Sequence, residues 1–179
     1  MDPVLLWVVR VVLALLFASA ALHKLRAPRS FAATLDAYAL LPARVVRPVA
    51  AGLGWVEAGV AATLLAPGFG ALPAAAGAAL LLVYSGAIAI NLARGRTDID
   101  CGCLGPALSA AQREPSLSAW LLGRNAFLLG ACALLAVPEV ARPWVWVDGL
   151  SVFAGAAAVA LCWIAAHQLA ALPTLRRVS

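Results

Sequence analysis

The chain has 179 residues, of which 64% are hydrophobic and 12% are charged, and its formal net charge is +5 at pH 7. About a quarter of the residues in soluble domains are charged, so a mean hydropathy of +0.96 excludes an ordinary soluble domain and favours a chain dissolved in lipid. The positive charge indicates basic loops on one membrane face rather than nucleic-acid binding, because the basic residues form no stripe interleaved with aromatic residues.

Five segments are long and apolar enough to cross a bilayer, which takes about 20 residues per helix. In chain order they cover residues 4–22, 46–66, 71–94, 119–137 and 149–172. Pro48 falls in the first turn of the second segment, where proline is tolerated. Residues 28–41 carry apolar side chains at helical spacing but are too short to span, which predicts a helix lying in the interface. We therefore expect an all-α polytopic membrane bundle that forms a single domain over residues 1–179, with a cysteine-bearing polar loop at 95–118.

Basic residues are distributed unevenly over the connections. Most fall in the first connection, around the third segment or at the C-terminus: Lys24, Arg26, Arg29, Arg44, Arg47, Arg94, Arg96, Arg113, Arg176 and Arg177. Arg142 is alone on the other side. The positive-inside rule therefore predicts an outer N-terminus and a cytoplasmic cysteine loop and C-terminus. His23 and Lys24 are expected to anchor the first helix by reaching toward the cytoplasmic surface.

The most distinctive local feature is the segment Asp98-Ile99-Asp100-Cys101-Gly102-Cys103-Leu104-Gly105. Gly102 frees the backbone between the cysteines, and a disulfide closed over so short a loop would be strained and easily reduced. Such disulfides are typical of thiol–disulfide exchange, in which Cys101 and Cys103 would form and resolve a mixed disulfide. Two inert thiols, a structural disulfide and metal binding remain alternatives. Two thiolates are too few for a closed zinc site, so no metal is assigned.

Two further cysteines, Cys132 and Cys162, fall near mid-bilayer in the fourth and fifth segments, judged from the helical rise. They could pair, or relay electrons to and from the loop cysteines. The simpler interpretation is that each is a small apolar residue in an apolar helix.

Several polar or ionisable side chains are expected inside the membrane: Arg10, Glu57, Asn91, Arg124, Asn125 and His167. Such groups are costly in lipid and usually face the bundle interior. Glu57 is the most central, and Arg10 or Arg124 could reach toward it. The set predicts either a polar cavity for a quinone, a proton or a small solute, or internal ion pairs that fix helix packing. No cofactor is assigned from these residues, although a quinone is one candidate.

The cysteine segment and the residues before it resemble the signature of the methylamine utilization protein MauE family. The similar residues are Asn91-Leu92-Ala93-Arg94-Gly95-Arg96 and Ile99-Asp100-Cys101-Gly102-Cys103-Leu104-Gly105, with Arg10, Phe17, Ala20, Lys24, Phe31, Tyr38-Ala39-Leu40-Leu41-Pro42, Glu57 and Gly59. The resemblance runs from about Arg10 through the fifth segment. The broader relatives are DoxX-like membrane proteins, which implies a four-helix core within about five transmembrane helices.

The resemblance implies a bacterial inner-membrane protein that assists the maturation of methylamine dehydrogenase or of a related periplasmic protein. The implied partners, besides the lipid bilayer, are a periplasmic thioredoxin-like protein and the disulfide-rich small subunit of the dehydrogenase. Cys101 and Cys103 would be the exchange pair of a thiol–disulfide oxidoreductase, although the residues leave open whether the chain is an enzyme. The charge bias places this pair in the cytoplasm. Either the loop returns into the bundle, or electrons enter there and cross the membrane.

Two other functions fit the residues. A non-enzymatic assembly or export scaffold would use its cysteines structurally and would fail mainly when a small packing residue such as Gly59 is enlarged. A quinone-binding or solute-transporting bundle would depend on Glu57, Arg124 and Asn125 instead of the loop cysteines. The chain lacks a phosphate-binding loop, an H-E-x-x-H sequence and a serine-hydrolase elbow, so it gives no support to a nucleotide-driven or hydrolytic enzyme.

Overall fold

The computed structural model describes residues 1–66, 68–97, 117, 119–140 and 142–170, with side chains described as far as residue 166. Within these residues every regular element is an α-helix: α1 (Pro3–Arg26), α2 (Pro28–Ala37), α3 (Ala43–Leu65), α4 (Leu72–Ala93), α6 (Ala119–Leu134) and α7 (Trp146–Ala170). Four of these helices are long and apolar enough to cross a membrane, namely α1, α3, α4 and the Trp146–Ala166 part of α7. The predicted all-α membrane bundle is therefore confirmed. The remaining apolar helix, α6, has 16 residues and is shorter than a usual span.

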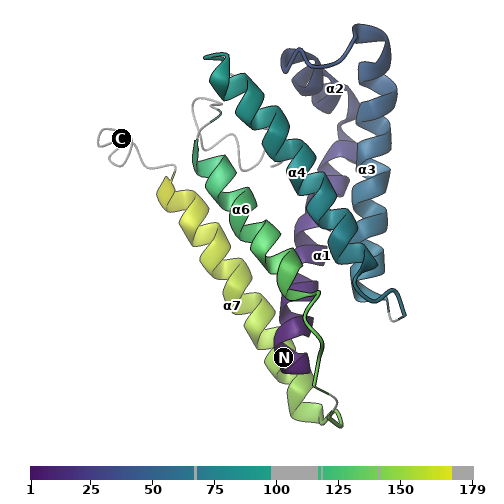
Figure 1. The fold of residues 1–179 in the computed structure, drawn as a ribbon, viewed down its shortest axis with the longest axis vertical. Coiled ribbons are helices and arrows are strands. Elements are labelled where there is room, and N and C mark those ends of the chain that lie inside the picture. The colour runs from purple at the N-terminus through teal and green to yellow at the C-terminus, as the bar shows by residue number, and fades with distance from the viewer. Residues whose placement is uncertain (67, 98–116, 118, 141, 171–179) are drawn as a thin grey trace.

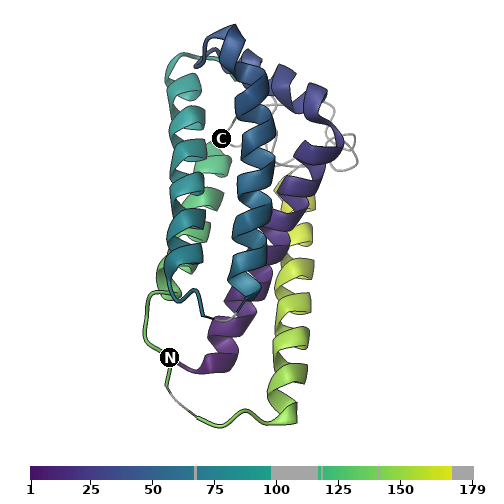
Figure 2. The same cartoon turned by 90° about the vertical axis from the view of Figure 1, so that its right-hand side faces the viewer.

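Helix α1 contacts more of the other described helices than any other element does. It packs most extensively on α3 and also on α7, while α4 packs on both α6 and α3. The long helices run side by side (Figure 1), and α1 crosses the bundle obliquely from the N-terminus (Figure 2). Along the described residues α6 and α7 have no extensive contact with each other. This arrangement leaves room between α6 and α7 over the surface of α1.

One end of the bundle is strongly basic. The alternation of helix direction brings the C-terminal ends of α1, α4 and α7 and the N-terminal ends of α3 and α6 to the upper end in Figure 1. Exposed arginines lie on these ends and on α2: Arg26, Arg29, Arg44, Arg47, Arg94 and Arg96. The segment that carries Cys101 and Cys103 leaves and rejoins the described structure at this same end.

The opposite end is closed by a small ion cluster. Arg142 donates two hydrogen bonds of 2.9 Å to the two carboxylate oxygens of Asp148 and one of 3.4 Å to Asp2. Asp2 also caps α1 by accepting the backbone N–H of Val4 at 2.8 Å, and this bond, with Arg142, holds the pKa of Asp2 below its ordinary value. The hydrogen bond to Asp148 in turn raises the pKa of Arg142. The cluster ties the start of α1 to the start of α7.

The helices differ in extent from the segments expected from hydropathy. Helix α1 continues to Arg26, because helical hydrogen bonding does not stop where the apolar run stops. Helix α3 begins at Ala43, so Pro48 lies inside the helix and not in its first turn as predicted. Helix α2 ends at Ala37, and it packs on α3 and α1, with Phe31 buried at 6% exposure. It therefore covers the basic end of those two helices.

Three glycines allow close approach between elements. A Cβ at Gly54 would lie 3.0 Å from the Leu25 side chain, one at Gly77 would lie 3.0 Å from the Phe17 ring, and one at Gly155 would lie 3.0 Å from Val8. A Cβ at Gly59, which was predicted to be a packing position, would have no neighbouring atom within 4 Å. That expectation is wrong because Gly59 lies on a face of α3 that no neighbouring helix approaches closely.

Candidate functional site

A buried ion pair lies at the junction of α1 and α3. Nζ of Lys24 donates to Oε1 and Oε2 of Glu57 at 2.6 and 2.7 Å, and the two side chains are 2% and 1% exposed. Arg10 and Arg124, the partners expected for Glu57, do not fill this role. Arg10 lies 14 residues before Lys24 on α1, which is about 21 Å along the helix axis. Its guanidinium instead lies over the Trp7 ring, at 5.7 Å from the centroid.

The pair is completed by aromatic side chains from two other helices. The hydroxyl of Tyr84 on α4 donates to Oε1 of Glu57 at 2.6 Å. Nζ of Lys24 lies 4.9 Å from the ring centroid of Phe31 on α2 and 5.2 Å from that of Tyr84, within cation–π range. Four helices thus meet at one charge-compensated cluster. This arrangement offsets much of the cost of desolvating both charges.

The sequence interpretation of Lys24 as a surface anchor is wrong. Lys24 is 3% exposed and continues the buried stripe of α1, in which Phe17, Ala20 and Ala21 precede it at helical spacing. The helix does not end before Lys24, so its side chain stays in phase with that stripe and points into the bundle. The phase of the stripe was the signal that could have identified Lys24. Tyr84, in the mostly apolar helix α4, carried no comparable signal.

A second polar group joins α6 to α4. Nδ2 of Asn125 donates to Oγ of Ser85 at 3.1 Å, and Oγ of Ser85 donates to the backbone carbonyl of Leu81 at 2.7 Å. Oδ1 of Asn125 accepts a hydrogen bond of 3.3 Å from Nη2 of Arg124. Arg124 is 9% exposed, and its Nε is buried without a hydrogen-bond partner among the described residues. These two residues therefore face the interior, as expected.

Asn91 is also buried, at 0% exposure, but it serves the end of α4. Its Nδ2 donates to the carbonyl of Ala87 at 3.0 Å, and within the described structure its Oδ1 has no partner. Its backbone carbonyl accepts from Arg96 N–H at 2.9 Å, and Gly95 N–H donates to the Leu92 carbonyl at 3.0 Å. With Gly95 at a φ of 70°, this is a Schellman C-cap. The cap fixes the direction in which the chain leaves α4 toward the cysteine segment.

The far end of the cysteine segment returns to the same place. The N–H of Leu117 donates to the carbonyl of Thr97 at 2.7 Å, and Leu117 is 2% exposed in a small core with Tyr38, Ile88 and Leu121. Cys101 and Cys103 themselves lie outside the described residues. Thr97 and Leu117, which flank their segment, are held together beside α4 and α6.

The membrane cysteines lie in unlike surroundings. Cys132 is a free thiol at 3% exposure in the main hydrophobic core, whereas Cys162 is a free thiol exposed on α7. This difference gives no geometric support to their pairing. The side chain of His167 lies outside the described side chains, and among the described residues no three His, Cys, Asp or Glu side chains cluster as metal ligands.

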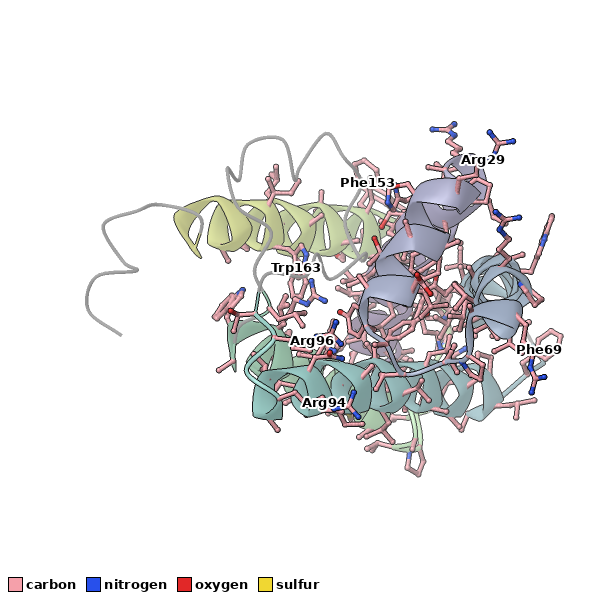
Figure 3. The ribbon with its side chains drawn as sticks, turned by 90° about the horizontal axis from the view of Figure 1, so that it is seen from above. Arg29, Phe69, Arg94, Arg96, Phe153 and Trp163 are labelled. Atoms are coloured by element: carbon pink, nitrogen blue, oxygen red, sulfur yellow. The ribbon has the colours of Figure 1, made fainter. Side chains whose placement is uncertain are left out.

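An apolar cavity of about 750 Å³ reaches the two polar groups. Its walls come mainly from α1, α6 and α7, and Lys24, Glu57, Tyr84, Arg124 and Asn125 are the ionisable or strongly polar side chains that line it. Trp163 forms part of the α7 wall, and Figure 3 shows it projecting from α7 toward the other helices. A volume of this size is ordinary for a small-molecule site.

The fold and this site define a polytopic helical membrane protein with an internal polar cluster, an apolar cavity and an anchored cysteine loop. The chain belongs to the MauE family of methylamine utilisation proteins, whose family model matches residues 2–138. The matched range includes Lys24, Glu57 and the cysteine loop and ends before α7.

Curated relatives agree with this assignment. The methylamine utilization protein MauE of Paracoccus denitrificans is 44% identical over 133 residues, which are 74% of this chain and 68% of the relative. The MauE protein of Paracoccus versutus is 40% identical over 176 residues, 96% of this chain and 90% of the relative. That of Methylorubrum extorquens is 39% identical over 147 residues, 80% and 76% of the two chains. No solved structure matches the chain.

Proposed function

We propose that this protein assists the maturation of methylamine dehydrogenase, or of a related periplasmic protein, by thiol–disulfide exchange with a thioredoxin-like partner. The observation that carries the proposal is the pair Cys101 and Cys103, separated by one glycine, in a member of the MauE family. The relatives' names connect them with methylamine utilisation.

The exchange would proceed in two balanced steps. One thiolate of the pair attacks a sulfur of the partner's disulfide, which forms a mixed disulfide and releases the partner's second sulfur as a thiolate. The other cysteine then attacks the mixed disulfide, which closes the Cys101–Cys103 bond and frees the reduced partner. Two electrons pass to the partner, and the reverse sequence oxidises it. The relative reduction potentials set the direction.

Two structural features support a reactive rather than a purely structural role for the loop cysteines. The hydrogen bond between Thr97 and Leu117 holds the two ends of the loop together. A disulfide that forms and breaks between Cys101 and Cys103 would therefore leave the helices in place. The exposed Arg94 and Arg96 lie at the start of the loop, where positive charge favours a thiolate. By the positive-inside rule we infer that this basic end faces the cytoplasm, so electrons that serve a periplasmic protein would enter at the loop and cross the membrane.

The proposal is tested by trapping the mixed disulfide. Cys101→Ser and Cys103→Ser variants are expressed in a host that lacks its own family member, and membranes are run on non-reducing gels. One of the two variants should accumulate a reducible adduct with a thioredoxin-like protein, and both should lose dehydrogenase maturation. Cys132→Ala and Cys162→Ala are the controls and should mature the enzyme normally. Full maturation by the Cys101→Ser/Cys103→Ser double variant would overturn the proposal.

The side of the membrane is tested separately. A membrane-impermeant maleimide applied to intact cells should leave the loop unlabelled until the membrane is permeabilised. Labelling of intact cells after reduction, absent in the double variant, would place the pair on the outer face.

A second candidate function is a scaffold without chemistry, in which the ion pair that joins α1 and α3 would serve helix packing alone. A scaffold would tolerate loss of both loop cysteines and would fail when the helix contact at Gly77 is enlarged.

A further inference from the structure

We propose that the cavity between α1, α6 and α7 binds a long-chain anionic amphiphile, with its hydrocarbon chain along α1 and its carboxylate or phosphate head at Arg124. This binding site is independent of the proposed thiol exchange, because it uses no cysteine and is tested by binding alone.

The cavity has the length and lining of a hydrocarbon-chain site. Its wall on α1 runs from Leu5 to Lys24, a distance of about 28 Å along the helix axis. The α6 and α7 walls add further apolar side chains: Phe127, Leu128, Leu134, Val159, Trp163 and Ile164. An extended chain is the ligand shape that fits so long and apolar a space.

Among the described residues, the polar end of the cavity carries a positive charge that no carboxylate compensates. Lys24 is neutralised by Glu57, but no carboxylate among the described residues lies within ion-pair distance of Arg124. Arg124 lines the cavity at 9% exposure, and its Nε has no hydrogen-bond partner in the described structure. A buried charge is costly unless it is paired. An anionic head group would supply both the missing charge and the missing hydrogen-bond acceptor.

The cavity is also open to the place where such amphiphiles are dissolved. Several of its wall residues are exposed on the outer surface of the bundle, including Leu5 at 47%, Leu15 at 55%, Phe127 at 68% and Ile164 at 49%. Leu5, Leu15 and Ile164 lie on helices long enough to span a membrane, so lipid would surround them. A lipid-like molecule can therefore enter sideways between α6 and α7, which have no extensive contact with each other along the described residues.

The test uses palmitic acid that carries a photoreactive diazirine in its chain, added to the purified full-length protein in uncharged detergent. The uncharged probe is the matched fatty alcohol. The acid should label peptides of α1, α6 and α7 saturably, and at least about tenfold more tightly than the alcohol, as expected for a hydrogen-bonded ion pair. Equal affinity for the acid and the alcohol would contradict the assignment of an anionic head group. Displacement of the labelled acid by a short-chain neutral quinone as readily as by unlabelled palmitic acid would contradict it as well.

Variants at Arg124 and Gly130, both on α6, separate the head from the chain. Arg124→Gln should weaken binding of the acid at least about tenfold and leave binding of the alcohol nearly unchanged, whereas Arg124→Lys should retain part of the preference for the acid. Gly130→Leu places a side chain in open cavity space and should abolish labelling by both probes. Gly123→Leu, on the same helix but outside the cavity, is the control and should bind normally. Unchanged labelling of the Gly130→Leu variant would show that the cavity is not the site.

Discussion

Nζ of Lys24 lies 2.6 Å from Oε1 of Glu57, although the two residues are 33 positions apart in the chain and both side chains are almost fully buried. This contact joins the C-terminal end of α1 to the middle of α3, and the hydroxyl of Tyr84 adds α4 to the same carboxylate. The pair is therefore the point at which three membrane helices are fixed relative to one another. Its energetic weight can be measured directly.

Glu57→Gln should destabilise the protein by about 3 kcal/mol or more, because it leaves the Lys24 ammonium buried without a counter-charge. The measurement is thermal unfolding of the purified protein in detergent. Replacing both residues with methionine should restore most of the loss, since no charge then remains to be desolvated. Glu139→Gln is the control, because Glu139 is exposed in the connection between α6 and α7. A Glu57→Gln variant as stable as the wild type would contradict the buried pair.

Tyr84→Phe should cost about 1.5–3 kcal/mol, the range for a hydrogen bond to a charged group. The cost should fall to about 0.5–1.5 kcal/mol in a Glu57→Gln background, where the acceptor is a neutral amide oxygen. A double-mutant cycle over the two positions measures this coupling. Additive losses would show that the Tyr84 hydroxyl contributes to stability independently of the Glu57 carboxylate.

Gly77→Leu should destabilise the bundle by about 1–3 kcal/mol, the usual cost of overpacking, because the new side chain would meet the Phe17 ring. Gly86→Leu, on the same helix with no atom within 4 Å of its Cβ position, provides the matched control. It should be neutral or slightly stabilising, since leucine is a better helix former than glycine. Equal effects at the two positions would mean that α4 does not approach α1 as described.

Gly95→Ala should lower stability by about 1–2 kcal/mol, because a φ of 70° places a Cβ in the left-handed region. The variant should also expose the start of the cysteine segment to added protease more rapidly than in the wild type. Gly123→Ala serves as the comparison, as it places alanine in an exposed helix interior and should be stabilising. An unchanged protease pattern would show that this C-cap does not anchor the start of the cysteine segment.

The ion cluster at the opposite end should weaken in acid. The folded-state pKa of Asp2 is lowered by the Val4 N–H and by Arg142, so its contribution to stability is present above its ordinary value of 3.8 and is lost as the pH falls through the lower folded value. The difference in melting temperature between wild type and Asp2→Asn should therefore be largest near about pH 6 and shrink below 3.8. A difference that grows in acid would have the wrong sign for this cluster.

Hydropathy and charge were sufficient to predict the class of fold, because lipid tolerates few arrangements of a backbone other than apolar helices. The family signature around Cys101 and Cys103 was likewise readable from the chain, since it is a local run of residues. The free-energy cost of placing polar side chains in lipid was enough to predict that Arg124 and Asn125 face the interior, where both are buried. Helix ends were predicted less well, as shown by Arg26 and Pro48, because capping and packing, not hydropathy, decide where a helix begins and ends.

The sequence by itself determined that this protein is a helical membrane bundle with costly polar groups inside it. Only the tertiary structure decided that Glu57 pairs with Lys24 and Tyr84 while Arg124 is left facing a cavity. The physical reason is that burial cost depends on one residue and its local segment, whereas pairing depends on the rotation and offset of several helices at once. Those offsets are set by contacts between residues far apart in the chain, such as Gly77 with Phe17.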